Sequence, residues 1–331
     1  MKTYDVLAAG AVTLDYLISG VGDSLMKEDS ILSEEALYSL GGDGLNTAVS
    51  LHRLGLSVLF TGCIGDDDNG RLLTSKMEKE GLSSKGLIVL KEGNTSAPVV
   101  LIERTGERHI LRTKNSANGF LKEDMISDEL LEESRHLHIG SANVLRSLDG
   151  APLGRLFERA KRKGLSTSLD VSYSKEKSAL GSVRYALANC DIFLPSIQEA
   201  REITGKEDVE EMAEALLEYP VKILGIKLGE KGVFLTDRNE KLYLPSLYRQ
   251  RPVDTTGAGD AFMAGFLAGC LEGLDLRSCG LMGSSQSCSV LGNIGASRSA
   301  GDRRENLKRI FEAGYTLQTR EGKEYGTVQY Q

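Results

Sequence analysis

The stretch DTTGAGD, residues 254–260, places the small residues Gly257, Ala258 and Gly259 directly before a carboxylate, and the apolar run AFMAGFLAGC follows at once. Small residues let a ligand approach the backbone closely, and a glycine-rich turn that enters a helix points N–H groups at an anion. We therefore expect these three residues to form an anion site at the start of a helix.

Asp260 falls in the first turn of that expected helix, where its carboxylate would face the same pocket. An anion site beside a carboxylate suits phosphoryl transfer. The N–H groups stabilise the moving phosphoryl group, and the carboxylate accepts the proton of the attacking hydroxyl. A tight turn with an Asp near a helix start gives the same pattern, and glycine-rich turns are common. The loop alone leaves both interpretations open.

A second glycine-rich segment, GGDGLNTAVSLHRLG at residues 41–55, continues with apolar residues at helical spacing and ends in glycine. This pattern predicts a turn followed by a helix. Asp15 and Asn46 are polar residues beside flexible backbone, and they could hydrogen-bond the hydroxyl groups of a ligand. They could equally be an exposed strand residue and a residue of the first helical turn.

Two common nucleotide motifs are missing from the sequence. It contains no G-x-x-x-x-G-K-[ST] and no G-x-G-x-x-G after the first apolar run, and the protein-kinase motifs are absent as well. If a nucleotide binds, another architecture must hold it.

Composition excludes several classes of function. The chain has 331 residues, 40% of them hydrophobic and 26% charged, and a net charge of -7, which is typical of a globular protein without a basic nucleic-acid surface. Its five cysteines are scattered and form no C-x-x-C pair, which argues against a disulfide framework or a zinc site. The N-terminus is too polar for a signal peptide, and no apolar run approaches the ~18 residues of a membrane span. We therefore expect a cytoplasmic protein that binds neither nucleic acid nor a membrane.

Strand-like and helix-like segments alternate along most of the chain, which predicts an α/β fold whose largely parallel sheet is covered on both faces. The expected strands of this sheet are YDVLAAG (4–10), SVLFTGCIG (57–65), RHLHIGS (135–141), STSLDV (166–171), CDIFLPS (190–196) and KILGIKLG (222–229). KGVFLTD and KLYLPS, at 231–237 and 241–246, predict a hairpin beside it.

Residues 97–113 differ from the rest, because two β-rich runs around a turn predict a hairpin outside the main sheet. We expect one domain over residues 1–331, with a β lid formed from about 12–40 and 95–118. The polar tail at 316–331 is expected to pack poorly.

Both glycine-rich motifs resemble the two signatures of the PfkB, or ribokinase-like, carbohydrate kinase family. The first runs from Gly41 to Gly65 and the second covers residues 254–267, and the resemblance extends over about residues 4–300. It implies an ATP-dependent kinase that phosphorylates a hydroxyl, usually the primary one, of a sugar or a related small molecule. It also implies a three-layer α/β/α sandwich with a mostly parallel central sheet and a small β-sheet lid.

The resemblance assigns roles to individual residues. Asp260 would be the catalytic base, and the amides of Gly257, Ala258 and Gly259 the anion hole. Asp15, Gly42 and Asn46 would hold the acceptor hydroxyls, and Asp43 and Arg112 are further candidates for acceptor contacts.

KLGEKG, residues 227–232, resembles the nucleotide loop of the family, so Lys227, Gly229 and Gly232 would lie near ATP, although the segment alone could be a plain hairpin turn. VLGNIGASRSA, which includes Asn293, resembles the loop that helps to enclose adenine and, in many members, a monovalent cation. By the same resemblance, Asp254 would ligate a potassium ion.

The sequence departs from the family pattern at three positions. The usual Asn-x-x-Glu of the magnesium region reads Ser196-Ile197-Gln198-Glu199, so Glu199 matches and would act on Mg²⁺ through a water, whereas a serine replaces the asparagine. Asp43 stands where ribokinases carry a lysine, and Ser141 stands about where they carry an acidic ribose contact. Both changes weaken a specific expectation of ribose.

Basic residues and histidines leave further alternatives open. His109 lies beside Arg104, Arg108 and Arg112 in the expected lid, where they could contact an acidic or phosphorylated acceptor, and solvation is the favoured interpretation. His136 and His138 share one strand face without an evident third ligand, so we expect no metal site there.

Three hypotheses follow for the function. The leading one is a sugar kinase that uses Mg-ATP. A nucleoside kinase of the same fold is the alternative, which the low aromatic content of 6% and the lack of Trp disfavour. A non-catalytic ligand-binding relative is the third, and the retention of Asp260 and its loop opposes it. The resemblance also implies a homodimer formed through the lid, which would cover the exposed lid face.

Overall fold

The computed structural model describes residues 2–22, 29–103, 108–172 and 178–325. Over these residues the central sheet has nine strands in the order β13-β12-β11-β10-β9-β8-β1-β4-β5. They are β1 (Tyr4–Ala9), β4 (Val58–Gly65), β5 (Leu87–Leu90), β8 (Ser134–Ala142), β9 (Ser166–Val171), β10 (Ile192–Phe193), β11 (Ile223–Lys227), β12 (Val233–Thr236) and β13 (Lys241–Leu244). The neighbours from β11 to β5 pair in parallel, whereas β12 and β13 form an antiparallel hairpin. The predicted mostly parallel sheet is confirmed.

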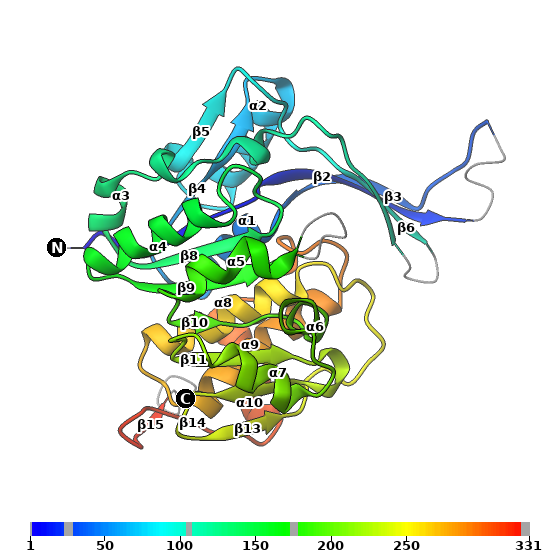
Figure 1. Cartoon of the computed structure of the whole chain (residues 1–331). Coiled ribbons are helices and arrows are strands. Elements are labelled where there is room, and N and C mark those ends of the chain that lie inside the picture. The colour runs from blue at the N-terminus through cyan, green and yellow to red at the C-terminus, as the bar shows by residue number, and fades with distance from the viewer. Residues whose placement is uncertain (1, 23–28, 104–107, 173–177, 326–331) are drawn as a thin grey trace.

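Helices cover both faces of this sheet (Figure 1). They are α1 (Asp43–Arg53), α2 (Asp68–Lys79), α3 (Asp128–Glu132), α4 (Ala151–Arg162), α5 (Ala179–Leu187), α6 (Ile197–Thr204), α7 (Val209–Leu216), α8 (Ala258–Leu271), α9 (Leu276–Leu291) and α10 (Arg303–Glu312). Short 3₁₀ helices lie at Ser84–Gly86, Ala117–Phe120, Glu123–Met125 and Gly229–Lys231. Each helix in the parts of the chain that the structure describes is too short or too polar to cross a lipid bilayer.

The central strand β1 shows why the sheet needs two helical layers. Its side chains alternate between the faces, as the pleat requires. Val6 and Ala8 join a buried cluster with residues of α1, α8, α9 and α10, whereas Leu7 and Ala9 join a second cluster with residues of α4 to α7. Because both faces are apolar and both are covered, the fold is the expected three-layer α/β/α sandwich.

A separate four-stranded sheet projects beyond the edge of the sandwich (Figure 1). It has the order β3-β2-β6-β7, formed by β2 (Thr13–Val21), β3 (Glu35–Gly41), β6 (Val99–Glu103) and β7 (Arg108–Leu111). β2 and β6 pair in parallel and the other neighbours antiparallel. We call this sheet the lid. The predicted hairpin forms, and its turn at 104–107 lies outside the described residues.

The C-terminal tail packs better than its polar sequence suggests. β14 (Leu317–Gln318) and β15 (Glu324–Tyr325) form a small hairpin, and Leu317 is fully buried. Ser278 accepts a hydrogen bond from the backbone N–H of Gln318 at 2.8 Å. The expectation of poor packing is therefore wrong at this hairpin's anchor, Leu317, whereas most other described tail residues are exposed and residues 326–331 lie outside the described part.

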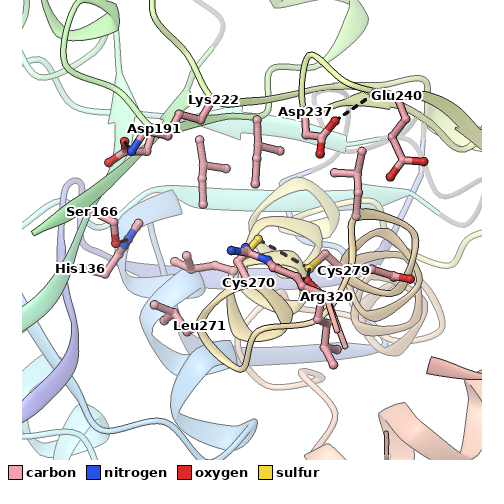
Figure 2. Close-up of a pocket in the computed structure, with 16 residues that line it drawn as sticks. His136, Ser166, Asp191, Lys222, Asp237, Glu240, Cys270, Leu271, Cys279 and Arg320 are labelled. Carbon is pink, nitrogen blue, oxygen red and sulfur yellow. Dashed lines mark hydrogen bonds and ion pairs between the residues drawn. The ribbon is translucent and has the colours of Figure 1, made fainter. Parts of the chain in front are cut away.

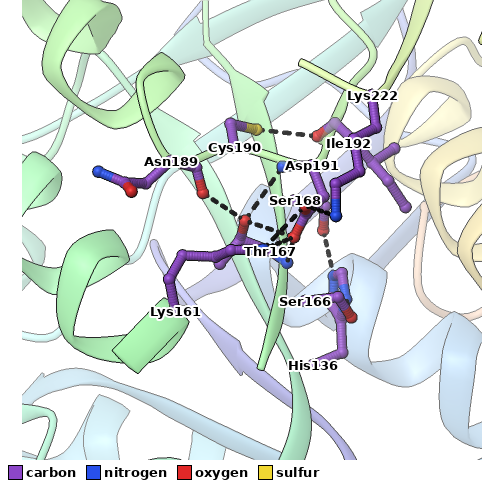
Figure 3. Close-up of polar contacts among 10 residues, drawn as sticks. All are labelled: His136, Lys161, Ser166, Thr167, Ser168, Asn189, Cys190, Asp191, Ile192 and Lys222. Atoms are coloured by element: carbon purple, nitrogen blue, oxygen red, sulfur yellow. Dashed lines mark hydrogen bonds and ion pairs between the residues drawn. The ribbon is translucent and has the colours of Figure 1, made fainter. Parts of the chain in front are cut away.

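Polar side chains stabilise the amino ends of β9, β10 and β11 (Figure 3). Asp191 accepts hydrogen bonds from the Lys161 Nζ at 2.6 Å and from the Thr167 N–H at 2.9 Å, and it pairs with Lys222 at 2.8 Å. Burial alone would raise the pKa of Asp191, but the hydrogen bonds from the two lysines hold it below its usual value. This cluster connects three strands and α4, so it serves the fold.

His136 and His138 lie fully buried on β8. His136 hydrogen-bonds Ser166 and Ser168, both at 2.7 Å, and His138 hydrogen-bonds Ser168 at 2.8 Å. Burial lowers the pKa of each histidine to about 3, so both are neutral at physiological pH. Their partners are serine hydroxyls, and the described residues contain no group of three side chains that could hold a metal ion.

Small residues let α8 and α9 pack closely in the core. A Cβ atom on Gly265 of α8 would lie 2.4 Å from the carbonyl oxygen of Met282 on α9, a distance that no side chain can occupy. On Gly269 it would lie 3.1 Å from the Cα of Cys279. The glycines of AFMAGFLAGC thus bring α8 against α9, and α8 begins at the anion loop.

We predict that Gly265→Ala destabilises the fold by ~1–3 kcal/mol, because the new methyl group forces the two helices apart. Gly181→Ala in α5 is the matched control. Its Cβ would meet no atom closer than 3.6 Å, so the exchange should be neutral or stabilising by up to ~1 kcal/mol. Urea unfolding of both variants measures the difference, and equal stabilities would contradict the packing argument.

Candidate active site

A cavity of about 870 Å³ lies where the carboxyl ends of the parallel strands meet the lid. Asp170 of β9, Ser196 after β10 and Lys227 of β11 line it from the sheet, and Val100 and Ile110 line it from the lid. Ligands of open parallel sheets bind at this end of the strands. The sequence-predicted residues that line the cavity are Asp15, Gly42, Asp43, Asn46, Arg112, Ser196, Glu199, Lys227, Gly229, Gly257, Gly259 and Asp260.

A second cavity, of about 610 Å³, opens at the opposite end of the parallel strands, near their amino ends (Figure 2). Its wall includes Leu267 and Leu271 of α8 with Cys270 and Cys279, and His136 and Asp191 contribute to it from the sheet side. Most of the residues that the sequence selects for chemistry line the first cavity, which is therefore the candidate site.

Asp260 occupies the first turn of α8, directly behind the glycine loop. Gly257 is the N-cap residue with φ 73°, in the left-handed region, and a Cβ there would lie 2.2 Å from the Cβ of Ala296. Glycine is thus required at this position for two reasons. The Ala258 N–H donates to the Thr255 carbonyl at 3.3 Å, and Ala258 does not line the cavity, so Gly257 and Gly259 fit the expected anion hole better than Ala258 does.

The surroundings of Asp260 favour its protonated form. Burial raises the pKa of Asp260 well above its usual value, and the nearby carboxylates of Asp43 and Asp170 raise it further. Asn46 opposes this by donating a hydrogen bond from Nδ2 to Asp260 Oδ2 at 2.8 Å. Asn46 Oδ1 is buried and has no partner among the described residues, so the amide retains an acceptor for a ligand hydroxyl.

Asp15 projects from β2 against the glycines that precede α1. A Cβ on Gly41 would lie 2.2 Å from its carboxylate, which explains why Gly41 carries no side chain. Burial raises the pKa of Asp15 to about 6, with Thr13 as a hydrogen-bond donor and Arg112 nearby, both of which oppose the rise. Asp43 accepts a hydrogen bond from the Ser172 hydroxyl. Asp15 thus reaches the cavity from the lid, and Asp43 reaches it from the first residue of α1.

Lys227 forms a buried ion pair that sequence analysis missed. Its Nζ lies 3.0 Å from Asp170 Oδ1, and the two side chains are 14% and 5% exposed. Burial alone would lower the pKa of Lys227, but Asp170, Glu199 and Asp260 raise it, so the lysine stays charged. Lys227 also lies behind the anion loop, because a Cβ on Gly259 would be 3.1 Å from Nζ. The sequence feature that could have identified Asp170 as a site residue is its place at the carboxyl end of a predicted parallel strand, where ligands bind.

Ser196 and Glu199 form a capping box at the start of α6. The Ser196 N–H donates to Glu199 Oε2 at 2.7 Å, and the Glu199 N–H donates to the serine hydroxyl at 3.3 Å. Burial raises the pKa of Glu199 to about 7, although Lys227 opposes the shift. The serine that replaces the usual asparagine therefore has a definite structural role.

Arg146 and Ser141 are further cavity residues on or after β8. Ser141 adopts φ 67°, and its buried hydroxyl has no hydrogen-bond partner among the described residues. The predicted ligand contacts Gly232 and Asn293 do not line the cavity. A Cβ on Gly232 would lie 2.0 Å from the Leu244 carbonyl oxygen, so this glycine is needed by the turn itself.

Comparisons with known proteins show the family of the chain. The pfkB family carbohydrate kinase model matches residues 5–302. An uncharacterised sugar kinase of Archaeoglobus fulgidus is 30% identical over 248 residues, which cover 75% of this chain and 96% of the relative. Fructokinase-1 of Zea mays is 28% identical over 269 residues, covering 79% of this chain and 81% of that protein.

The fold agrees as well. The structure of Arabidopsis thaliana ribokinase complexed with ribose and ATP superposes with a TM-score of 0.77 at 23% identity, over 93% of this chain and 99% of that one. With the family match extending from the first strand almost to α10, the chain belongs to the pfkB family of carbohydrate kinases.

Proposed function

We propose that this kinase transfers the γ-phosphoryl group of ATP to a hydroxyl, most simply the primary one, of a sugar or sugar-like acceptor, with Asp260 as the general base. The observation that carries the proposal is the position of Asp260. It is buried at the N-terminus of α8, beside the glycine loop, in the cavity that also contains Asp15 and Asn46. A carboxylate whose pKa is raised by burial is a stronger proton acceptor than an exposed one.

The cavity divides into two ends along the sheet. Lys227, Gly229 and Ser196 lie at β10 and β11, whereas Asp15 and Gly42 lie beside the lid and β1. Asp260 lies between them, because it hydrogen-bonds Asn46 and interacts electrostatically with Lys227. We assign the β10–β11 end to the phosphates of ATP and the lid end to the acceptor, so the base stands at the junction.

Each end has groups suited to its ligand. Lys227 and the amides at Gly257 and Gly259 would stabilise the negative charge of the transferring group. Asp15, Asp43 and Asn46 would hydrogen-bond and orient the acceptor hydroxyls. Mg²⁺ in kinases is held mainly by phosphates with one or two carboxylates, and it would supply charge neutralisation at the phosphates. Glu199 fits such a role through a water, because only Oε2 is used by the capping box.

A sugar acceptor is favoured over a nucleoside by the cavity wall. The described residues that line it include carboxylates, amides, hydroxyls and cations but neither an aromatic ring nor a histidine. Base recognition commonly uses aromatic stacking, whereas sugar hydroxyls require hydrogen-bonding groups. The direct test is ADP release from Mg-ATP across a panel of hexoses, pentoses, keto-acid sugars, inositols and nucleosides. ATP binding without turnover of any acceptor would oppose the proposal.

We predict that Asp260→Asn lowers kcat by ~10²–10⁴-fold, because the amide cannot accept the hydroxyl proton. The fold should remain at least as stable, since the substitution removes a buried carboxyl. Asp124→Asn, an exposed position outside the cavity, is the matched control and should retain normal turnover. Steady-state kinetics with the best acceptor of the panel measures the effect, and a near-normal rate for Asp260→Asn would exclude it as the base.

We predict that Asp15→Asn gains stability relative to the natural chain as pH rises. The folded pKa of Asp15 is raised from 3.8 to about 6, so between these values the folded chain holds a proton that the unfolded chain releases. Stability that depends on Asp15 is therefore complete below pH 3.8 and is lost as pH rises through about 6.

The amide should consequently stabilise the fold by ~1–2 kcal/mol above this window and by much less below it, after allowance for partial solvent screening. Unfolding titrations at acidic and neutral pH measure the difference. The same variant should raise the KM for the acceptor. A stability difference that does not change with pH would show that Asp15 is not perturbed.

A further inference from the structure

The lid contributes one residue that reaches the loop in front of the anion hole. Arg108, the first residue of β7, places Nη1 at 3.4 Å from Asp254 Oδ1 and also hydrogen-bonds the Thr256 hydroxyl. The Asp254 side chain is only 2% exposed and that of Arg108 is 29% exposed. A cation from the lid thus faces an almost fully buried carboxylate 146 residues away in sequence.

The carboxylate of Asp254 has its acceptor positions filled. Oδ1 accepts from the Thr256 N–H at 2.8 Å and from the Thr256 hydroxyl at 2.6 Å, in addition to Arg108. Oδ2 accepts from the Gly295 N–H at 3.1 Å. A carboxylate offers about four lone-pair positions. The four donors at Asp254 are enough to occupy these positions.

This arrangement does not fit the potassium ion that the family resemblance implies at Asp254. Potassium is held by oxygen atoms with lone pairs directed at the ion. At Asp254 those lone pairs are directed at N–H and O–H donors, and the guanidinium already provides a positive charge at the carboxylate. A potassium ion would have to displace Arg108.

Asp254 in turn organises both loops at the start of α8. Its hydrogen bond with Thr256 fixes the residue before Gly257, the N-cap of α8. Its hydrogen bond with Gly295 fixes the segment that packs on Gly257, where the neighbouring Ala296 leaves room only for glycine. A buried carboxylate without a counter-charge is costly, so its neutralisation decides whether this arrangement is stable.

We propose that Arg108 is a positioning residue that takes the place of a monovalent cation at Asp254, so that the lid organises the anion hole and the enzyme works without potassium. The inference rests on the proposed function for its kinetic consequence. The guanidinium neutralises Asp254, holds Thr256, and keeps the Gly257 and Gly259 amides directed at the phosphoryl group. Arg108 acts through these residues and does not itself line the cavity.

The test compares the natural chain with Arg108→Gln, Arg108→Lys and the control Arg162→Gln, an exposed arginine of α4 outside the cavity. Kinase activity is measured in buffers free of alkali cations and again with added potassium or sodium chloride. The natural chain and the control should change less than about twofold with potassium. Without potassium, Arg108→Gln should lose ~10–100-fold in kcat/KM, the range expected when a positioned group shifts by about an ångström. Potassium should restore a substantial part of that loss, and Arg108→Lys should retain most activity.

A second readout does not depend on turnover. Potassium should raise the unfolding temperature of Arg108→Gln more than sodium does, because only that variant leaves Asp254 open to the ion. It should not do so for the natural chain. Strong potassium activation of the natural chain would overturn the proposal, as would an Arg108→Gln variant that is active without potassium or that responds to it neither in activity nor in stability. If the natural chain phosphorylates no acceptor, the proposed function fails, whereas the potassium-dependent stability still decides the role of Arg108.

Discussion

The candidate site depends on charge balance in a buried space. Asp170, Asp260 and Lys227 lie together at the carboxyl ends of the strands, and all three are largely withdrawn from water. Burial raises the pKa of Asp170 and that of Asp260, and Lys227, which stays charged, offsets this only in part because one lysine faces several carboxyls. Because the carboxylates outnumber the cations near them, ionised Asp260 gains stability when it takes up a proton, and it is a good proton acceptor for that reason. The same lysine leaves a positive charge behind the glycine loop, where a phosphoryl group would be stabilised.

The fold tolerates this imbalance because the scaffold around it is rigid and apolar. β1 is buried on both faces, and α8 packs so closely on α9 that glycine is required at the contact. Both features fix the N-terminus of α8 relative to the sheet edge, which keeps Asp260 near Asn46 at 2.8 Å although 214 residues separate them. Active sites commonly keep unfavourable electrostatics in this way, at some expense of stability.

The sequence was sufficient for local features and insufficient for distant pairings. The loop at 254–260 and the helix that follows it carry their own signals, as do the alternating strands, because glycine turns and apolar periodicity are properties of neighbouring residues. The ion pair of Asp170 with Lys227 and the contact of Arg108 with Asp254 carry no such signal, since each joins segments far apart in the chain. Solvation was the favoured interpretation for the lid basic residues. His109 and Arg112 are indeed exposed, and Arg104 lies outside the described residues, whereas Arg108 lies against the buried Asp254. The hairpin in the tail was missed for a similar reason. The backbone N–H of Gln318 donates to the hydroxyl of Ser278 on α9, which is far from the tail in sequence.

The way the lid is inserted connects the proposed acceptor end of the cavity with the core. β2 follows β1 after a short turn and β3 leads directly into α1, so the lid strands are continuous with two core elements. Their register pairs Thr13 with Gly41 and Asp15 with Ser39, which places the Asp15 carboxylate against the glycines at the start of α1. A one-residue slip would turn Asp15 to the opposite face of the lid and remove it from the cavity. The apolar contacts of Leu17 with Val100 and Ile102 oppose that slip, because they require the same face to remain buried. The small lid core thus fixes the position of Asp15, for which we propose a role in acceptor binding, although none of the proposed catalytic residues belongs to it.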